Sequence, residues 1–298
     1  MNRRKFLQDA CSAAALMTLP LQTRARAEAA KIATRSIPST GDALPIVGFG
    51  QSTSFRENDF ENSAALLDTL RNLGGKFVDT GASAQQLFGR YMQENSASAD
   101  LFLGTNIRTP DAAADLQAIE DSKMSLDKDV LDLLQLYRPD DFRAQWPRMQ
   151  RWRDEGHTRH IGVAVTGDEF FGMLEALLKS GKPDFIQVNY SMLEPQSADR
   201  ILPLAQDNGV AVLTNRPFVN GEYFGLVKGR ELPEWTADFD CHSWAQFSLK
   251  WILGNPSVNC TLTETSKVHH AVDNLSAGLG RLPDAATRDR MRSLLQSF

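Results

Sequence analysis

The stretch DFIQVNYSMLEPQSADRILPLAQDNGVAVLTN, residues 184–215, contains two short apolar runs with an amphipathic segment between them. The runs occupy residues 184–190 and 209–215, and neither alternates strictly between apolar and polar positions. Runs of this kind are typical of strands that are buried on both faces of a parallel sheet. A strand, a helix and a second strand in this order form one repeating unit of an α/β fold.

The same alternation recurs along most of the chain. Apolar runs occupy residues 45–50, 76–80, 101–106, 130–137, 160–165, 184–190, 209–215 and 258–263. Eight such units predict an α/β fold of the (β/α)8 TIM-barrel type, which one domain over residues 36–298 is long enough to form. A doubly wound sheet is disfavoured because Thr53 stands where the third glycine of a dinucleotide-binding fingerprint would be.

Residues 1–27 have the pattern of a cleaved export signal. Arg3 and Arg4 precede an apolar run that is about half the roughly 20 residues a membrane helix needs, and ARA follows at 25–27. The segment resembles a twin-arginine signal peptide, which predicts a periplasmic protein without a stable membrane anchor; an ordinary secretory signal is the alternative. Cleavage would change the formal net charge from −5 to −9, which disfavours nucleic acid as a partner.

Several segments together resemble the aldo/keto reductase family, from about Ile37 to about Met291. They are IPSTGDALPIVGFG (37–50), FVDT (77–80), LDLLQLY (131–137), RHIGV (159–163), FIQVNYS (185–191), GVAVLTNRPF (209–218), SWAQFSLKWILGNPSV (243–258) and TSKVHHAVDNLSAG (265–278). The resemblance implies reduction of aldehydes and ketones with a nicotinamide cofactor, usually NADPH. It also implies a catalytic tyrosine, a lysine that lowers the tyrosine's pKa, an aspartate that holds the lysine, and a histidine that orients the carbonyl oxygen.

Only one of these four catalytic residues is present at its expected position. Asp79 corresponds to the aspartate, whereas Asn106 stands in place of the lysine and Tyr137 in place of the histidine. The loop GASA at 81–84 is short and contains no tyrosine. The resemblance therefore implies a weakly active or inactive relative of carbonyl reductases, in which we expect Asp79 to be solvated or bonded to backbone donors.

Two other hypotheses remain open. Tyr137 could act as the acid of an active oxidoreductase with a small carbonyl substrate, a role for which Tyr91 is a weaker candidate because it belongs to a helix. Alternatively, the barrel is the scaffold of an exported, non-enzymatic binding protein, with a protein partner at the mouth of the barrel.

The segment that resembles the family's cofactor site is better preserved. By resemblance, Gln187 would contact the nicotinamide amide, and residues after the last strand would bind the adenosine end of NADP(H). Those residues are Thr265 and Ser266 for the phosphate, Lys267 or His270 for charge, and Asp273 with Asn274 for the adenine. Glu264 opposes this interpretation because it places negative charge beside the phosphate, and a solvated helix start is the alternative.

No pattern of metal ligands is found in the sequence. His157 and His160 are three residues apart in HTRH, which lacks the glutamate of a zinc-protease helix and is expected to be a solvated loop. Cys241 and Cys260, which remain after removal of the signal, are expected to be separate buried thiols.

Overall fold

The computed structural model describes residues 31–50, 54–56, 58–108 and 111–298, so the predicted signal peptide lies outside the described residues. Eight parallel strands form a closed barrel in the order β10-β3-β4-β5-β6-β7-β8-β9. Their bounds are β3 (Val47–Phe49), β4 (Phe77–Thr80), β5 (Phe102–Ile107), β6 (Leu131–Tyr137), β7 (Thr158–Ala164), β8 (Phe185–Asn189), β9 (Ala211–Asn215) and β10 (Cys260–Thr263). The predicted (β/α)8 barrel, and each of its eight strands, is confirmed.

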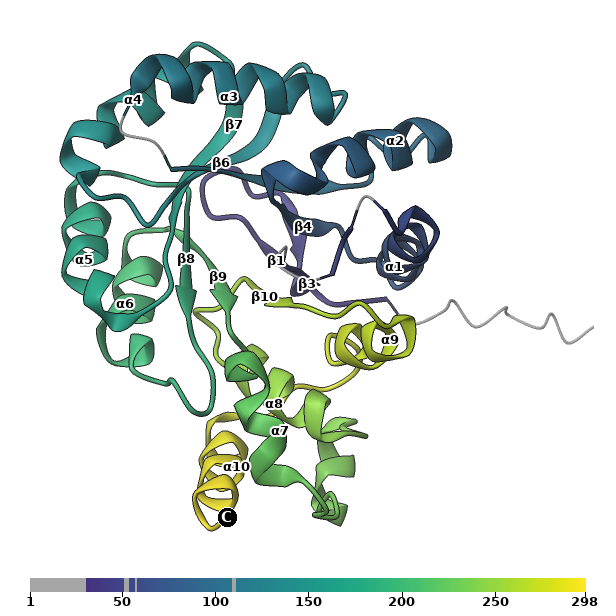
Figure 1. The fold of residues 1–298 in the computed structure, drawn as a ribbon. Coiled ribbons are helices and arrows are strands. Elements are labelled where there is room, and N and C mark those ends of the chain that lie inside the picture. Colours follow the sequence, from purple (N-terminus) through teal and green to yellow (C-terminus); the bar gives the residue numbers. More distant parts are fainter. Residues whose placement is uncertain (1–30, 51–53, 57, 109–110) are drawn as a thin grey trace, which may run out of the picture.

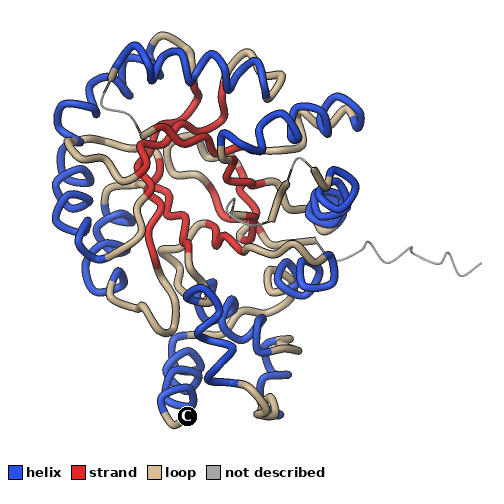
Figure 2. Tube along the Cα trace, viewed as in Figure 1, coloured by secondary structure: helices blue, strands red, loops and turns tan. Residues whose placement is uncertain are grey.

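Helices surround the barrel on its outside (Figures 1 and 2). They are α1 (Phe60–Asn72), α2 (Gln85–Asn95), α3 (Ala112–Ser125), α4 (Phe142–Asp154), α5 (Phe171–Ser180), α6 (Ser197–Asp207), α7 (Glu222–Val227), α8 (Trp244–Leu253), α9 (Val268–Ser276) and α10 (Ala285–Gln296). Aspartate or serine side chains cap several N-termini, such as Asp111 for α3 and Ser243 for α8, because these groups accept bonds from backbone donors that lack a helical partner. Within the described residues, no helix is both long and apolar enough to span a membrane.

The half of the barrel interior that lies nearer the start of the strands is apolar, and we call it the apolar floor. Phe77, Leu133 and Phe185 pack there with other buried side chains from β9 and β10. The hairpin formed by β1 (Thr34–Ser36) and β2 (Ala43–Pro45) adds Ile37 and Leu44 to the same cluster. The hairpin therefore closes the end of the barrel where the strands begin, and it was not predicted because its strands are only three residues long.

His160 belongs to this apolar floor, so the expectation that HTRH is a solvated loop is wrong for this residue. His160 lies on β7, is buried, and contacts the rings of Phe102 and Phe185. Burial lowers the pKa of His160, because the cationic form would lose its hydration, although Asp184 and nearby acids oppose this effect. The neutral imidazole therefore packs as an aromatic side chain.

Helix α8 holds a buried cation. Lys250 is fully buried, and its ammonium donates to the backbone carbonyls of Leu279 (2.8 Å) and Arg281 (2.9 Å). Burial lowers the pKa of this ammonium, and the two carbonyls lie in the segment between α9 and α10. Lys250 thus fixes the C-terminal segment against the barrel wall.

The two remaining cysteines are confirmed as separate buried thiols. Cys241 lies before α8, and Cys260 begins β10 inside the barrel. Burial raises the pKa of Cys241 to about 12 and raises that of Cys260 as well, because neither thiolate would be solvated. Both therefore act as small apolar side chains.

Candidate active site

Four polar side chains form a connected set inside the barrel, near the ends of β4, β5, β6 and β8. Asp79 accepts bonds from the amides of Asn106 (Nδ2 to Oδ1, 2.7 Å) and Gln187 (Nε2 to Oδ2, 3.2 Å). Gln135 donates from its Nε2 to Gln187 Oε1 (3.2 Å) and to Asn106 Oδ1 (3.5 Å). We call Asp79, Asn106, Gln135 and Gln187 the polar ring. It separates the apolar floor from the mouth, where the strands end.

The partners of Asp79 correct the expectation that it is solvated or bonded only to backbone donors. The residue is 6% exposed, and its carboxylate is held by two side-chain amides, one from the adjacent strand β5 and one from β8 on another side of the barrel. Burial raises the pKa of Asp79 to about 7; the bonds from Gln187 and Asn106 oppose this rise, and the charge of Glu264 adds to it. Asn106, at the expected lysine position, therefore supplies a neutral donor in place of a cation.

Gln135 is a site residue that sequence reasoning missed. It lies within β6, in a run that was interpreted as a buried strand without a functional side chain at this position. Its Oε1 atom is buried without a hydrogen-bond partner, although its Nε2 atom makes two bonds. A polar residue two positions before Tyr137 in such a run was the available signal, because residues i and i+2 of a strand point to the same face.

Tyr137 and Arg108 lie at the mouth above the polar ring. The register pairs Asn106 with Gln135 and Ile107 with Leu136, so Arg108 and Tyr137 are the next neighbours on β5 and β6. Tyr137 is two residues beyond Gln135 on the same strand and therefore lies on the inward face, whereas Arg108 follows the last residue of β5. The guanidinium carbon of Arg108 is 5.9 Å from the centroid of the Tyr137 ring.

Tyr91 lies apart from this arrangement. It is fully buried on α2, and its hydroxyl donates to Asp68 Oδ1 (2.5 Å) on α1. Burial raises the pKa of Tyr91 to about 12, so its phenol is a poor proton donor at neutral pH. Its interactions belong to the packing between helices.

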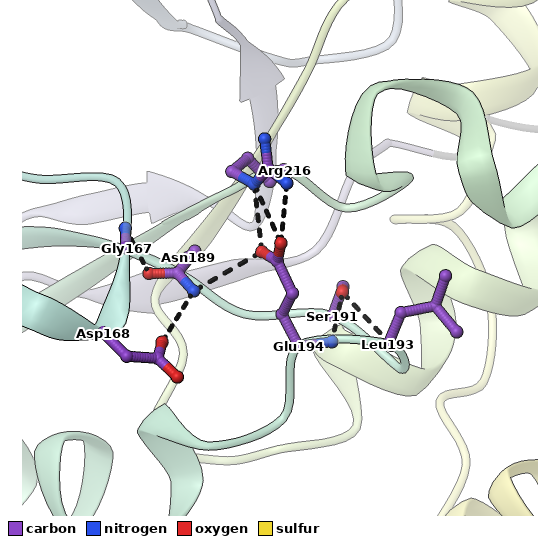
Figure 3. A network of polar contacts seen from close by, with 7 residues as sticks. All are labelled: Gly167, Asp168, Asn189, Ser191, Leu193, Glu194 and Arg216. Atoms are coloured by element: carbon purple, nitrogen blue, oxygen red, sulfur yellow. Dashed lines mark hydrogen bonds and ion pairs between the residues drawn. The ribbon is translucent and has the colours of Figure 1, made fainter.

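The loops after β7, β8 and β9 are joined by a second polar network (Figure 3). Asn189 accepts from the backbone of Gly167 (3.1 Å) and donates to Asp168 (3.2 Å) and Glu194 (3.4 Å). Arg216 binds Glu194 through two nitrogens, at 2.6 and 3.0 Å. The Arg216–Glu194 ion pair and the bonds of Asn189 therefore hold the three loops together.

The predicted residues of the adenosine end lie around the start of α9. The Thr265 hydroxyl accepts from the backbone of Lys267 (3.1 Å), and Ser266, Lys267 and His270 are exposed. The first turn of α9 has no side-chain cap, which leaves backbone donors for an anion. This arrangement has the chemistry of a phosphate site.

The other two predicted adenosine-end residues are more engaged with the protein. Asp273 accepts bonds from Ser243 Oγ (2.7 Å) and Gln246 Nε2 (2.7 Å), so its carboxylate ties α9 to the start of α8. Asn274 is buried. Across the part of the chain that the structure describes, no three histidine, cysteine, aspartate or glutamate side chains form a group that could hold a metal ion.

Comparison with known proteins gives a consistent result. The sequence profile described as the aldo/keto reductase family matches residues 46–289. The chain is 23% identical to L-galactose dehydrogenase of Arabidopsis thaliana, over 83% of this chain and 88% of that protein. It is also 23% identical to the aldo-keto reductase YhdN of Bacillus subtilis, over 69% of this chain and 66% of the relative.

Solved structures share the fold. The holo form of the aldo-keto reductase AKR11C1 from Bacillus halodurans has a TM-score of 0.73 at 20% identity, covering 88% of this chain and 96% of its own. An aldo-keto reductase from Klebsiella pneumoniae in complex with NADPH has the same TM-score and identity, with coverages of 90% and 96%.

Proposed function

Because this chain belongs to the aldo/keto reductase family, we propose that it is an NADP(H)-binding carbonyl oxidoreductase whose turnover is slow, since most of its proton-donating machinery is replaced. The observation that carries the proposal is the environment of Asp79. A neutral amide, that of Asn106, lies 2.7 Å from the carboxylate where the family pattern has an ammonium. No cation at that position is available to lower the pKa of a phenol. General acid catalysis contributes roughly 10²–10⁴-fold in rate, which sets the scale of the expected loss.

Cofactor binding rests on two parts of the mouth. Gln187 donates to Asp79, which fixes its amide, and the family resemblance assigns this residue to the nicotinamide. The uncapped start of α9 and the exposed Lys267 suit the phosphate of the adenosine end. The Klebsiella relative was solved with NADPH, which supports the choice of this cofactor.

The proposal includes a periplasmic location for the protein. If residues 1–27 are a twin-arginine signal, the protein would reach the periplasm folded, by a route that often exports proteins with their cofactor already bound. Repeated turnover there would require recycling of the bound cofactor, because a free NADPH pool is not expected in that compartment. The expected substrate is a small carbonyl compound, and a protein partner at the mouth is the alternative occupant.

The first test is a fluorescence titration of residues 28–298 with NADPH and NADH, followed by turnover with aldehydes. We expect a dissociation constant in the micromolar range for NADPH and a low turnover number. Lys267→Gln should weaken NADPH binding by about tenfold, because one charge-assisted contact is lost. The matched control is Lys179→Gln at the end of α5, which should leave binding unchanged. Absence of binding at millimolar cofactor would exclude the reductase function and favour a binding protein.

A second candidate is an active reductase that uses Tyr137 as its acid, and the position of Arg108 favours it. The guanidinium carbon of Arg108 lies 5.9 Å from the centroid of the Tyr137 ring, beside the phenol that would donate the proton. In that case Tyr137→Phe should lower carbonyl reduction by about 10²–10⁴-fold without changing the dissociation constant for NADPH. Unchanged turnover in Tyr137→Phe would exclude Tyr137 as the acid.

A further inference from the structure

The mouth of the barrel has an unpaired cation on one side. Arg108 is exposed, and among the described residues its guanidinium has no ion pair or hydrogen bond. Two other arginines of the mouth differ, because Arg138 contacts Glu169 (3.5 Å) and Arg216 is bound by Glu194. The charge of Arg108 therefore remains available to a ligand.

The position of Arg108 is set by the sheet. It follows Ile107, the last residue of β5, at the end of the strand that opens into the mouth. The ring of Tyr137 on the adjacent strand is beside its guanidinium, at 5.9 Å. A ligand above the polar ring would thus meet the guanidinium of Arg108 and the phenol ring of Tyr137 on the same side.

This site is separate from the adenosine end of the cofactor. In the closed barrel, β5 is three strands away from β10, after which the candidate phosphate site begins. Two anion-binding positions on different sides of one mouth can serve two ligands at once. Since the position near α9 fits the cofactor phosphate, the position at Arg108 is available to the second substrate.

We propose that Arg108 recognises the carboxylate of an anionic carbonyl substrate, an oxo acid or a carboxylated aldehyde, and holds it against Tyr137. A guanidinium presents parallel N–H donors that match the two oxygens of a carboxylate, which a neutral aldehyde lacks. The inference rests on the proposed function for its chemistry. Bound NADPH would supply a hydride to the carbonyl carbon, the C=O π pair would move to oxygen, and a proton from Tyr137 or water would complete the alcohol. Arg108 forms and breaks no bond.

Two readouts test the proposal independently of each other. The first compares kcat/KM for 4-carboxybenzaldehyde with kcat/KM for 4-methylbenzaldehyde, using NADPH. Arg108→Gln should lower the ratio of the two by about ten- to a hundredfold, whereas Arg108→Lys should retain part of it. Lys179→Gln, far from the mouth, should leave the ratio unchanged. An equal loss for both aldehydes in Arg108→Gln would overturn the assignment.

The second readout needs no turnover, so it separates this inference from the proposed function. Benzoate and benzamide are titrated calorimetrically against the full chain with and without NADPH. We expect benzoate to bind more tightly than benzamide, and this preference to disappear in Arg108→Gln and at high salt. Equal binding of the two probes, or a benzoate preference that survives in Arg108→Gln, would exclude Arg108 as the carboxylate site even if NADPH-dependent reduction is observed.

Discussion

Replacing Asp79 with asparagine is expected to stabilise the protein above pH 7, by up to about 4 kcal/mol. Burial raises the pKa of Asp79 to about 7, whereas an unfolded aspartate has a pKa near 3.9. The folded state therefore favours the protonated carboxyl, and the stability that this contributes is present below about pH 4 and lost as the pH rises through 7. Asparagine has no such dependence, and its amide can bond to Gln187 and Asn106 once these side chains rotate.

The measurement is the free energy of unfolding in urea between pH 4 and pH 9, for wild type and Asp79→Asn. The difference between the two should grow as the pH rises and level off above pH 7. Asn106→Lys should also be more stable than wild type above pH 7, but for a different reason. An ammonium beside Asp79 would lower the pKa of the carboxyl. Glu231→Gln on an exposed loop is the control. A difference that does not change with pH would show that Asp79 is ionised without cost.

Replacing Lys250 with methionine is expected to lower the free energy of unfolding by about 2–4 kcal/mol. Methionine fills a similar volume, but it leaves the carbonyls of Leu279 and Arg281 without the ammonium donor that both use. Each unsatisfied buried acceptor costs about 1–3 kcal/mol. Methionine also removes the cost of burying a cation, which offsets part of the loss from the two carbonyls. Local loosening of the segment between α9 and α10 should accompany the loss.

Urea unfolding and hydrogen exchange of residues 278–284 measure these two effects. Lys179→Met, on an exposed part of α5, provides the control for replacing a lysine and should change stability by less than about 0.5 kcal/mol. If Lys250→Met were as stable as wild type, with unchanged exchange in this segment, the two bonds would contribute nothing net to folding.

The barrel was predictable from the sequence because its strands are buried on both faces. Runs such as 184–190 and 209–215 are apolar at successive positions because one face of each strand packs against the helices and the other faces the barrel interior. The hairpin β1–β2 was not predictable in this way, since two strands of three residues give no periodicity. His160 was wrongly expected to be solvated, because a titratable residue near the start of a strand cannot be distinguished by sequence from the last residue of a polar loop.

The candidate site was predictable in its residue types and positions but not in its interactions. Asp79, Asn106 and Gln187 were identified by resemblance, whereas the bonds among them depend on the register of strands distant in sequence. Gln135 completes the polar ring from a run that was interpreted as an apolar strand, and Arg108 becomes a neighbour of Tyr137 only through the pairing of β5 with β6. Burial, which controls the pKa of Asp79, has no local signal in the sequence.

The hairpin β1–β2 has a practical consequence for handling the protein. It closes the end of the barrel opposite the mouth, and the described chain enters beside it, with Ile32 bonded to the carbonyl of Leu73 at the C-terminal end of α1. An affinity tag or biosensor linker fused ahead of Lys31 would therefore attach the molecule by the pole that carries no candidate site. Immobilised in this orientation, the protein would present its mouth to the solvent, and small ligands could be screened on a chip surface without steric interference from the anchor.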